Sequence, residues 1–330
     1  MSAATHSMDQ PLIIWCNVPF GPAASSRRQL LVDAVAGHTL HLVDGATSSE
    51  LSRSWLDQAS IVFGQPPVDA LLASHRIRWV EIASAGYEAY DRADLRAALT
   101  SRAVPMTNVG GVYADACAQH TLAMMLAANR ALPAAMDAQR DRRWTFAELR
   151  PRMRQLSQQR VLILGWGHIA RRLAELLAPF DLHLTAVRRR VVGDEPVRII
   201  TVDALDAELA RTDHLVNLLP GGADTARFVN APRLAQLPSG ARFYNVGRGS
   251  TVDQDALIAA LDSGHLDAAW LDVTDPEPLP PDHPLWRTAG CYITPHLAGG
   301  QADERGHQVR HFLGNLERFT SGRTLIDRIW

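Results

Sequence analysis

A glycine-rich turn, Gly165-Trp-Gly167-His-Ile-Ala170, has the residue types and spacing of a site that binds the phosphates of a dinucleotide. It follows the apolar run 161–164 and precedes leucines at helical spacing, which predicts a strand, a turn and a helix. Gly165 permits the tight turn, Gly167 lets the backbone approach a pyrophosphate, and Ala170 keeps the helix close to the strand. The helix N-terminus would face the phosphate charge. A tight turn without a ligand is the alternative, and the context favours a cofactor.

The residue that distinguishes NAD from NADP is expected about 20 residues further along the chain. An NAD site has a carboxylate there, whereas this chain has Arg188, followed by Arg189 and Arg190. A guanidinium group can pair with the 2′-phosphate of NADP through two parallel hydrogen bonds. The sequence therefore predicts NADP(H) as the preferred cofactor, with NAD(H) possible. A solvated basic loop is the alternative interpretation.

Three later segments carry an arginine, a carboxylate and a histidine. They are YNVGRGSTVDQDAL around Arg248, LDVTDPEPLPPDHPLW around Glu277 and TPHLAGG around His296. Each begins at the carboxyl end of a predicted strand, and ligands of open α/β sheets bind at that edge. The three side chains can therefore converge at one site.

In these segments and their order, the chain resembles the D-isomer-specific 2-hydroxyacid dehydrogenases, in particular their NADP-linked glyoxylate and hydroxypyruvate reductase branch. The resemblance extends from about Trp79 to Gly300. It includes GWGHIA, LVNLLP, the three segments above and, nearer the N-terminus, IASAGYEAYD and TNVGGVYADACAQHTLAMMLA. Residues 1–78 match only in the rhythm of their elements.

The resemblance implies that Arg248, Glu277 and His296 are the catalytic groups in the reduction of a small 2-oxo acid to a D-2-hydroxy acid. One guanidinium can bind the carboxylate of a 2-oxo acid and polarise the neighbouring carbonyl. An imidazolium can donate a proton while hydride arrives from the nicotinamide. A carboxylate beside that histidine favours its charged form and fixes its ring, which is the role implied for Glu277.

The resemblance also implies that the backbone N–H groups of Ala85 and Gly86 bind the substrate carboxylate, together with Arg248. Tyr87 stands where a small apolar residue is common, so it is expected to narrow the substrate pocket. The implied cofactor contacts, with Asp272 at the nicotinamide carboxamide, are Gly165, Gly167, His168, Ile169, Arg188, Arg189, Pro220, Thr225, Val246 and Asp272. The other histidines are expected to be surface or satisfied core residues, among them His120, His183, His283 and His311.

The elements that must position these groups alternate between short apolar runs and amphipathic stretches, which predicts α/β structure with parallel sheets. Strands are expected at 12–16, 40–43, 61–63 and 79–82, and then six more at 161–164, 182–187, 215–219, 242–246, 268–273 and 292–294. We expect two doubly wound parallel-sheet domains. A Rossmann NAD(P)-binding domain (109–299) is inserted into a flavodoxin-like substrate-binding domain (1–108 and 300–330).

A long helix is expected from about Ala114 to Leu132, and a polar connector from Arg140 to Gln159 in which Trp144 is the one large apolar residue. The helix has more apolar residues than one face can bury, namely Leu122, Met124, Met125 and Leu126. A homodimer is therefore expected, and burial of these residues between the two domains is the alternative.

Composition limits the remaining functions. The 330 residues are 47% hydrophobic and 21% charged, as in soluble globular proteins, and the net charge of -2 argues against nucleic acid as a partner. The three cysteines have no zinc-site spacing, so no metal is expected. Apolar runs are too short for a membrane span or a secretion signal, which makes a cytoplasmic location the default expectation. The alternative function is a nucleotide-sensing interaction protein of the corepressor type.

Overall fold

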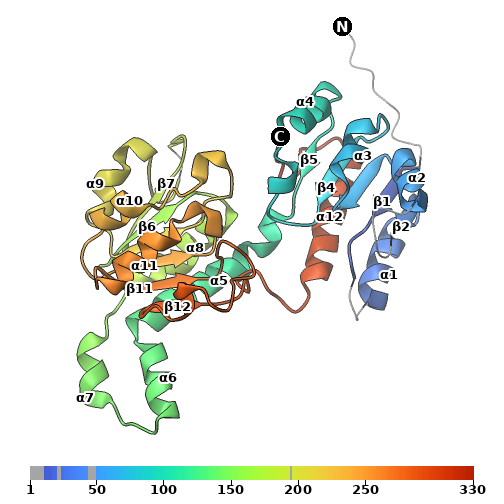
Figure 1. Cartoon of the computed structure of the whole chain (residues 1–330). Helices are drawn as coiled ribbons and strands as arrows, with labels where there is room; N and C mark the ends of the chain where they lie inside the picture. The colour runs from blue at the N-terminus through green and yellow to red at the C-terminus, as the bar shows by residue number, and fades with distance from the viewer. Residues whose placement is uncertain (1–10, 21–23, 44–49, 194) are drawn as a thin grey trace. The chain divides into compact units, whose positions relative to one another are not determined.

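The computed structural model describes residues 11–20, 24–43, 50–193 and 195–330, and these divide into two compact units. Unit 1 comprises Met1–Val112 and Gln301–Trp330, and unit 2 comprises Tyr113–Gly300. Each unit is built on its own sheet, and every pair of neighbouring strands in both sheets is parallel (Figure 1). Parallel neighbours need long crossover connections, which explains why helices separate most of the strands.

Unit 1 has five strands in the order β2-β1-β3-β4-β5, which is the flavodoxin-like order. Its strands are β1 (Ile13–Cys16), β2 (Thr39–Leu42), β3 (Ile61–Gly64), β4 (Trp79–Ile82) and β5 (Met106–Thr107). Its helices are α1 (Ala24–Ala34), α2 (Glu50–Gln58), α3 (Val68–Ala73), α4 (Ala93–Ser101) and α12 (Glu304–Thr320). Every residue of β3 and β4 is buried, because separate hydrophobic clusters cover the two faces of the sheet. The flavodoxin-like prediction is therefore confirmed, with β5 as an additional strand.

The C-terminal helix α12 returns to unit 1 and packs on its sheet. The ring of Phe312 stacks on Phe63 with 4.3 Å between centroids and on Trp79 with 5.2 Å. His311, on the same helix, lies between the carboxylates of Glu81 (3.1 Å) and Asp327 (3.2 Å). Burial alone would lower the pKa of His311, but its hydrogen bonds to the two carboxylates outweigh burial and raise the pKa to about 9. A protonated histidine thus ties the end of the chain to strand β4.

Unit 2 has seven strands in the order β12-β11-β10-β9-β6-β7-β8, which is the Rossmann order with one strand added at an edge. Its strands are β6 (Arg160–Leu164), β7 (His183–Val187), β8 (Arg198–Ile200), β9 (His214–Asn217), β10 (Ala241–Asn245), β11 (Leu266–Leu271) and β12 (Cys291–Ile293). Its helices are α5 (Gly110–Asn129, which begins in unit 1), α6 (Leu132–Arg140), α7 (Phe146–Leu149), α8 (His168–Leu177), α9 (Leu205–Leu209), α10 (Ala231–Gln236) and α11 (Gln254–Asp262). The expectation of six strands missed β8, which has only three residues and begins with an exposed arginine.

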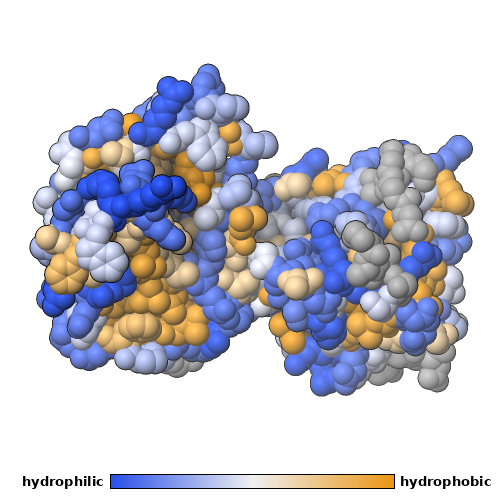
Figure 2. Space-filling model, turned by 90° about the horizontal axis from the view of Figure 1, so that it is seen from below, coloured by the Kyte–Doolittle hydropathy of each residue, from blue (hydrophilic) through white to orange (hydrophobic). Residues whose placement is uncertain are grey.

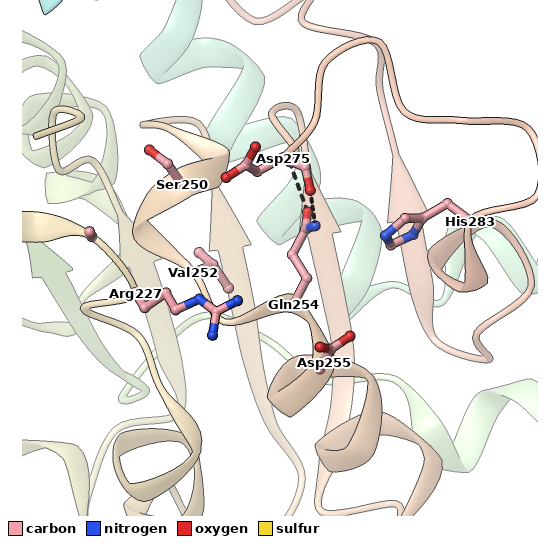
Figure 3. Close-up of a pocket in the computed structure, with 8 residues that line it drawn as sticks. Arg227, Ser250, Val252, Gln254, Asp255, Asp275 and His283 are labelled. Carbon is pink, nitrogen blue, oxygen red and sulfur yellow. Dashed lines mark hydrogen bonds between the residues drawn. The ribbon is translucent and has the colours of Figure 1, made fainter.

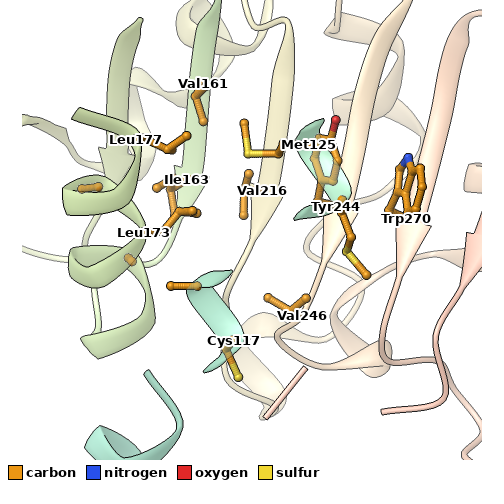
Figure 4. Close-up of a cluster of buried hydrophobic side chains, with 14 of the residues drawn as sticks. Cys117, Met125, Val161, Ile163, Leu173, Leu177, Val216, Tyr244, Val246 and Trp270 are labelled. Carbon is orange, nitrogen blue, oxygen red and sulfur yellow. The ribbon is translucent and has the colours of Figure 1, made fainter. Parts of the chain in front are cut away.

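Helix α5 is packed against the sheet of unit 2. Met124 and Met125 belong to the buried cluster shown in Figure 4, and Leu122 and Leu126 pack against it. The apolar residues that suggested a dimer thus all contact the core of unit 2, and the homodimer stays a prediction. Helix α5 also ends earlier than expected, because Ala131 adopts a left-handed conformation with φ of 50°.

The segment expected to be a plain connector forms a hairpin. Helices α6 and α7 project together from the body of unit 2 (Figure 1). Three of its large apolar side chains are exposed: Trp144 to 95%, Met136 to 59% and Phe146 to 58%.

Membrane-spanning helices and metal-binding clusters are both absent from the described residues. No helix there combines the length and apolar character needed to cross a membrane. No group of three or more histidine, cysteine, aspartate or glutamate side chains within the described ranges could hold a metal ion.

Candidate active site

The glycine-rich turn lies where the strand order of unit 2 changes direction, between β6 and β9. A Cβ atom on Gly165, whose φ is +99°, would lie 3.2 Å from the carbonyl oxygen of Leu218, which follows β9. A Cβ atom on Gly167 would meet nothing within 4 Å, so the space in front of this residue is open. Helix α8 begins at His168, has no acidic residue in its first turn, and starts with N–H groups that have no acceptor within the helix. This arrangement suits an anionic phosphate group.

Arg188 follows β7 and is part of an ion pair that the sequence analysis missed. Its Nη1 atom lies 3.0 Å from Oε1 of Glu195, whose side chain is almost completely buried. Glu195 also accepts hydrogen bonds from the backbone N–H groups of Val192 and Gly193. Arg189 and Arg190 are exposed. The guanidinium of Arg188 is thus held in place, but a carboxylate offsets part of its charge.

Pro220 and Thr225 follow β9, and Val246 follows β10. The hydroxyl of Thr225 donates to the carbonyl oxygen of Pro220 (2.7 Å) and closes the loop between them. Val246 is buried and belongs to the cluster that α5 covers. The hydroxyl of Thr225 is therefore already engaged within its own loop.

Arg248 is flanked by two glycines for a steric reason. A Cβ atom on Gly247 would lie 2.6 Å from the carbonyl oxygen of Leu219, and one on Gly249 would lie 1.9 Å from that of Thr274. Only glycine fits at both positions. The loop of Arg248 is therefore in close contact with Thr274, which lies three residues before Glu277.

The backbone of Arg248 is also held by buried polar side chains. Its carbonyl oxygen accepts hydrogen bonds from Asn245 Nδ2 (3.1 Å) and Thr251 Oγ1 (2.6 Å). Asn217 joins these two side chains by donating to both. The side chain of Arg248 donates from Nη1 to the carbonyl oxygen of Gly247. Strands β9 and β10 thus fix the position of the arginine.

Glu277 and His296 form a hydrogen-bonded pair. Oε2 of Glu277 lies 2.8 Å from Nδ1 of His296, and its Oε1 accepts the backbone N–H of Thr274 (2.9 Å). An ionised carboxylate only accepts hydrogen bonds, so Nδ1 of His296 carries the proton. The Nε2 atom is then the nitrogen available to a substrate. His296 is exposed and has a φ of 53°, an uncommon backbone conformation for a residue other than glycine.

Gln254 holds the start of the same loop and was missed from the sequence. Its side-chain Nε2 donates to the carbonyl oxygen of Asp275, and its Oε1 accepts the N–H of the same residue at 3.1 Å. Figure 3 shows this double contact beside a surface pocket of about 420 Å³. The first turn of α11 therefore fixes the peptide unit two residues before Glu277.

The carboxylate of Asp272 is buried and is engaged by the loop of His296. Oδ1 accepts hydrogen bonds from Thr294 Oγ1 (2.6 Å) and Leu297 N (2.8 Å), and Oδ2 accepts one from Ala298 N (2.9 Å). Its carbonyl oxygen accepts the N–H of His296 (2.8 Å). Asp272 is thus the centre around which residues 294–298 are folded.

Helix α5 presents Cys117 and His120 to this region, one helical turn apart. Burial raises the pKa of Cys117 to about 12, and the nearby charge of Asp272 adds to this rise. The thiol therefore stays protonated and is a poor nucleophile. His120 is half-buried and lies 3.1 Å from Thr294 Oγ1, which links it to the loop of His296. No spacing in the sequence relates His120 to a threonine 174 residues away.

The implied substrate loop belongs to unit 1. The carbonyl oxygen of Ala85 accepts a hydrogen bond from Asn108 Nδ2 (2.7 Å), and that of Gly86 accepts one from Ser84 Oγ (2.6 Å). Tyr87 packs against Trp330 with 6.3 Å between ring centroids. These contacts fix the loop that follows β4.

Comparison with known proteins points to one family. Residues 122–298 match the model of the D-isomer specific 2-hydroxyacid dehydrogenase NAD binding domain. The chain is 30% identical over 291 residues to a D-3-phosphoglycerate dehydrogenase of Mycobacterium bovis, covering 83% of this chain and 53% of the relative. It is 36% identical over 168 residues to a glyoxylate/hydroxypyruvate reductase A of Salmonella paratyphi B, covering 50% and 54%. The chain thus spans about half the length of each of these relatives.

A solved structure resembles almost the whole chain. It is a D-isomer specific 2-hydroxyacid dehydrogenase from Xanthobacter autotrophicus Py2 in complex with NADPH and MES. The TM-score is 0.81 at 28% sequence identity, and the match covers 97% of this chain and 98% of that one.

Proposed function

Because this chain belongs to the D-isomer specific 2-hydroxyacid dehydrogenase family, we propose that it reduces a small 2-oxo acid of the glyoxylate or hydroxypyruvate type to the D-2-hydroxy acid, with NADPH as the reductant. The observation that carries the proposal is the 2.8 Å hydrogen bond between Glu277 and His296, next to the loop that bears Arg248. An arginine and a carboxylate-paired histidine are the groups that this reduction requires.

Unit 2 has a cradle that suits the dinucleotide. The open space at Gly167 and the first turn of α8 suit the pyrophosphate, and Arg188 lies at the end of β7, where a 2′-phosphate would be recognised. We assign cofactor contacts to Gly165, Gly167, His168, Ile169, Arg188, Arg189, Pro220, Thr225, Val246 and Asp272. NADPH supplies the hydride when it is bound.

We assign to His296 the delivery of a proton to the substrate oxygen. Glu277 accepts the hydrogen bond from Nδ1, which orients the ring and stabilises the imidazolium. The carbonyl oxygen of the substrate becomes an alkoxide as hydride reaches the carbon, and the proton on Nε2 neutralises it. Because His296 is exposed in unit 2, solvent can supply the next proton.

Arg248 provides the positive charge that the substrate needs. Its guanidinium can pair with the substrate carboxylate and polarise the carbonyl beside it. We assign substrate binding to unit 1 as well, through the backbone N–H groups of Ala85 and Gly86. Their carbonyl oxygens are already bonded within unit 1, which keeps the loop in one conformation.

A panel of 2-oxo acids tests the proposed function most directly. NADPH oxidation should be measured with glyoxylate, hydroxypyruvate, pyruvate and 2-oxoglutarate, and NAD reduction should be measured with D-3-phosphoglycerate. We expect turnover with glyoxylate or hydroxypyruvate. Turnover of D-3-phosphoglycerate alone would replace the proposed substrate by the one in the name of the mycobacterial relative. Inactivity across the whole panel would favour the corepressor-type sensor.

The cofactor preference is a further prediction. We expect kcat/KM with NADPH to be roughly 10- to 100-fold higher than kcat/KM with NADH, because charge-assisted hydrogen bonds contribute about 1.5 to 3 kcal/mol each. Arg188→Asp should reverse the preference mainly through KM, because the 2′-phosphate lies far from the reacting carbon. Arg190→Asp is the matched control, since it changes the same basic run without the ion pair to Glu195.

Steady-state kinetics with both cofactors decide between the two interpretations of the arginine run. Equal efficiency with NADH and NADPH in the unmutated enzyme would show that the run is a solvated loop. An equal effect of the two substitutions would show that only the overall charge matters.

We also propose that two copies of the chain associate through the hairpin of α6 and α7. Its exposed tryptophan, methionine and phenylalanine lie on a projecting segment, where a second copy can cover them. Figure 2 shows hydrophobic residues gathered on the lobe of unit 2 that is seen from the hairpin side.

Light scattering should give twice the mass of one chain at micromolar concentration. Met136→Glu combined with Phe146→Glu should give a monomer, because both changes place charge in the apolar contact. Leu51→Glu, at an exposed leucine of unit 1, should leave the dimer intact. A monomer mass for the unmutated protein would reject the dimer.

A further inference from the structure

His120 stands at one end of a chain of hydrogen bonds that leads to the loop of His296. Its Nε2 atom lies 3.1 Å from Thr294 Oγ1 and 3.6 Å from Asp272 Oδ1. The hydroxyl of Thr294 has one proton, and this proton is donated to Asp272 at 2.6 Å. Nε2 of His120 must therefore be the donor to Thr294. The direction of the chain is from His120 to Thr294 to Asp272.

The far end of this chain controls the backbone around His296. Asp272 accepts the N–H groups of His296, Leu297 and Ala298 through three different oxygen atoms. His296 has a φ of 53°, a conformation that costs free energy and persists only where its surroundings enforce it. The hydrogen bonds to Asp272 are contacts that can enforce it.

From this arrangement we infer that His120 is a positioning residue for the proton donor His296, acting through Thr294 and Asp272. The inference rests on the proposed function. The N–H of His120 fixes the hydroxyl of Thr294, and this hydroxyl fixes one oxygen of Asp272. Loss of the N–H leaves the hydroxyl of Thr294 held by Asp272 alone, so residues 296–298 hold their conformation less firmly. His120 itself does not touch the reacting atoms.

Two substitutions separate the hydrogen bond from the packing of the ring. His120→Phe keeps a planar ring and removes the donor, whereas His120→Gln places an amide N–H close to the position of Nε2. We expect kcat to fall about 10-fold in His120→Phe, with KM and the dissociation constant of NADPH little changed, because one hydrogen bond of ordinary strength is lost. His120→Gln should restore most of the rate. Gln119→Ala, at the exposed neighbouring residue, should behave as the unmutated enzyme.

Thr294→Val tests the same chain of hydrogen bonds from the other side and does not require any change in α5. It should cause a similar loss, and the double variant with His120→Phe should lose little more, because both changes break one link. Full additivity of the two losses would overturn the inference. So would a His120→Gln variant as impaired as His120→Phe, because ring packing would then be the cause.

A measurement that does not depend on turnover separates this inference from the proposed function. Amide hydrogen exchange at Leu297 and Ala298 reports the hydrogen bonds to Asp272 directly. Exchange at both amides should be about 10-fold faster in His120→Phe and unchanged in His120→Gln. If exchange is unchanged in His120→Phe, the positioning role is rejected even in an active enzyme. If the unmutated protein turns over no 2-oxo acid, the proposed function fails and the exchange result still tests the link.

Discussion

Replacing His296 by alanine is expected to lower kcat for 2-oxo acid reduction by about 100-fold or more, which is the usual worth of a positioned proton donor. The carboxylate of Glu277 would remain and would face a developing negative charge. The dissociation constant of NADPH should stay unchanged, because the cradle at Gly165 and Gly167 lies on another loop of unit 2. Single-turnover kinetics and fluorescence titration with NADPH measure the two quantities separately.

His183→Ala is the matched control for this prediction. It removes an exposed histidine of the same unit at the start of β7 and should leave kcat unchanged. The kcat of Glu277→Gln should lie between the values for His296→Ala and the unmutated enzyme. A neutral amide can still orient the ring but stabilises the imidazolium less. A folded His296→Ala variant with near-normal turnover would remove His296 from the mechanism.

Arg248→Ala should have a comparable or larger effect, about 1000-fold in kcat/KM. Two charge-assisted hydrogen bonds are lost, each worth about 1.5 to 3 kcal/mol. KM should rise because the substrate carboxylate loses its partner, and kcat should fall because the carbonyl is less polarised. Both constants therefore need to be measured.

Arg248→Lys distinguishes charge from geometry. Lysine keeps the positive charge but cannot form two parallel hydrogen bonds, so it should recover only part of the activity. The buried network of Asn217, Asn245 and Thr251 holds the backbone and not the side chain, so both variants should fold. Values of kcat and KM within a factor of two of normal in Arg248→Ala would exclude the assigned role.

The fold and the family could be predicted from the sequence because their signals are local. The strand, turn and helix around Gly165 lie within one short segment, and the buried strand β6 contains a continuous apolar run at 161–164. The prediction of two parallel-sheet α/β domains is confirmed, as is the family. Strands β5 and β8 were missed because two or three residues give no periodic pattern, and only their neighbours in the sheet define them.

The supporting contacts of the site could not be predicted in the same way. Glu195, Gln254 and His120 are ordinary polar residues on helices and loops, and their roles depend on which atoms the fold brings near them. The packing of α5 could not be predicted for a similar reason. A helix with apolar residues on several faces can pack on a second chain or on its own sheet, and here the core of unit 2 buries Met124 and Met125.

The two points where the chain passes between the units have a consequence for how such a protein can arise. Within unit 1, Gln301 Nε2 donates to the carbonyl oxygen of Val112 at 3.1 Å. Within unit 2, a Cβ atom on Gly299 would lie 3.0 Å from the ring of Tyr113. A segment whose two ends meet can enter or leave a host chain without separating the ends of the host, so its insertion costs little chain entropy. A single recombination event that moves the coding region for residues 113–300 would therefore carry the complete glycine-rich turn and the Glu277–His296 pair into a new host. The host would keep all the strands of its own sheet and be interrupted at one position only. The two units of such a protein can therefore have separate genetic histories.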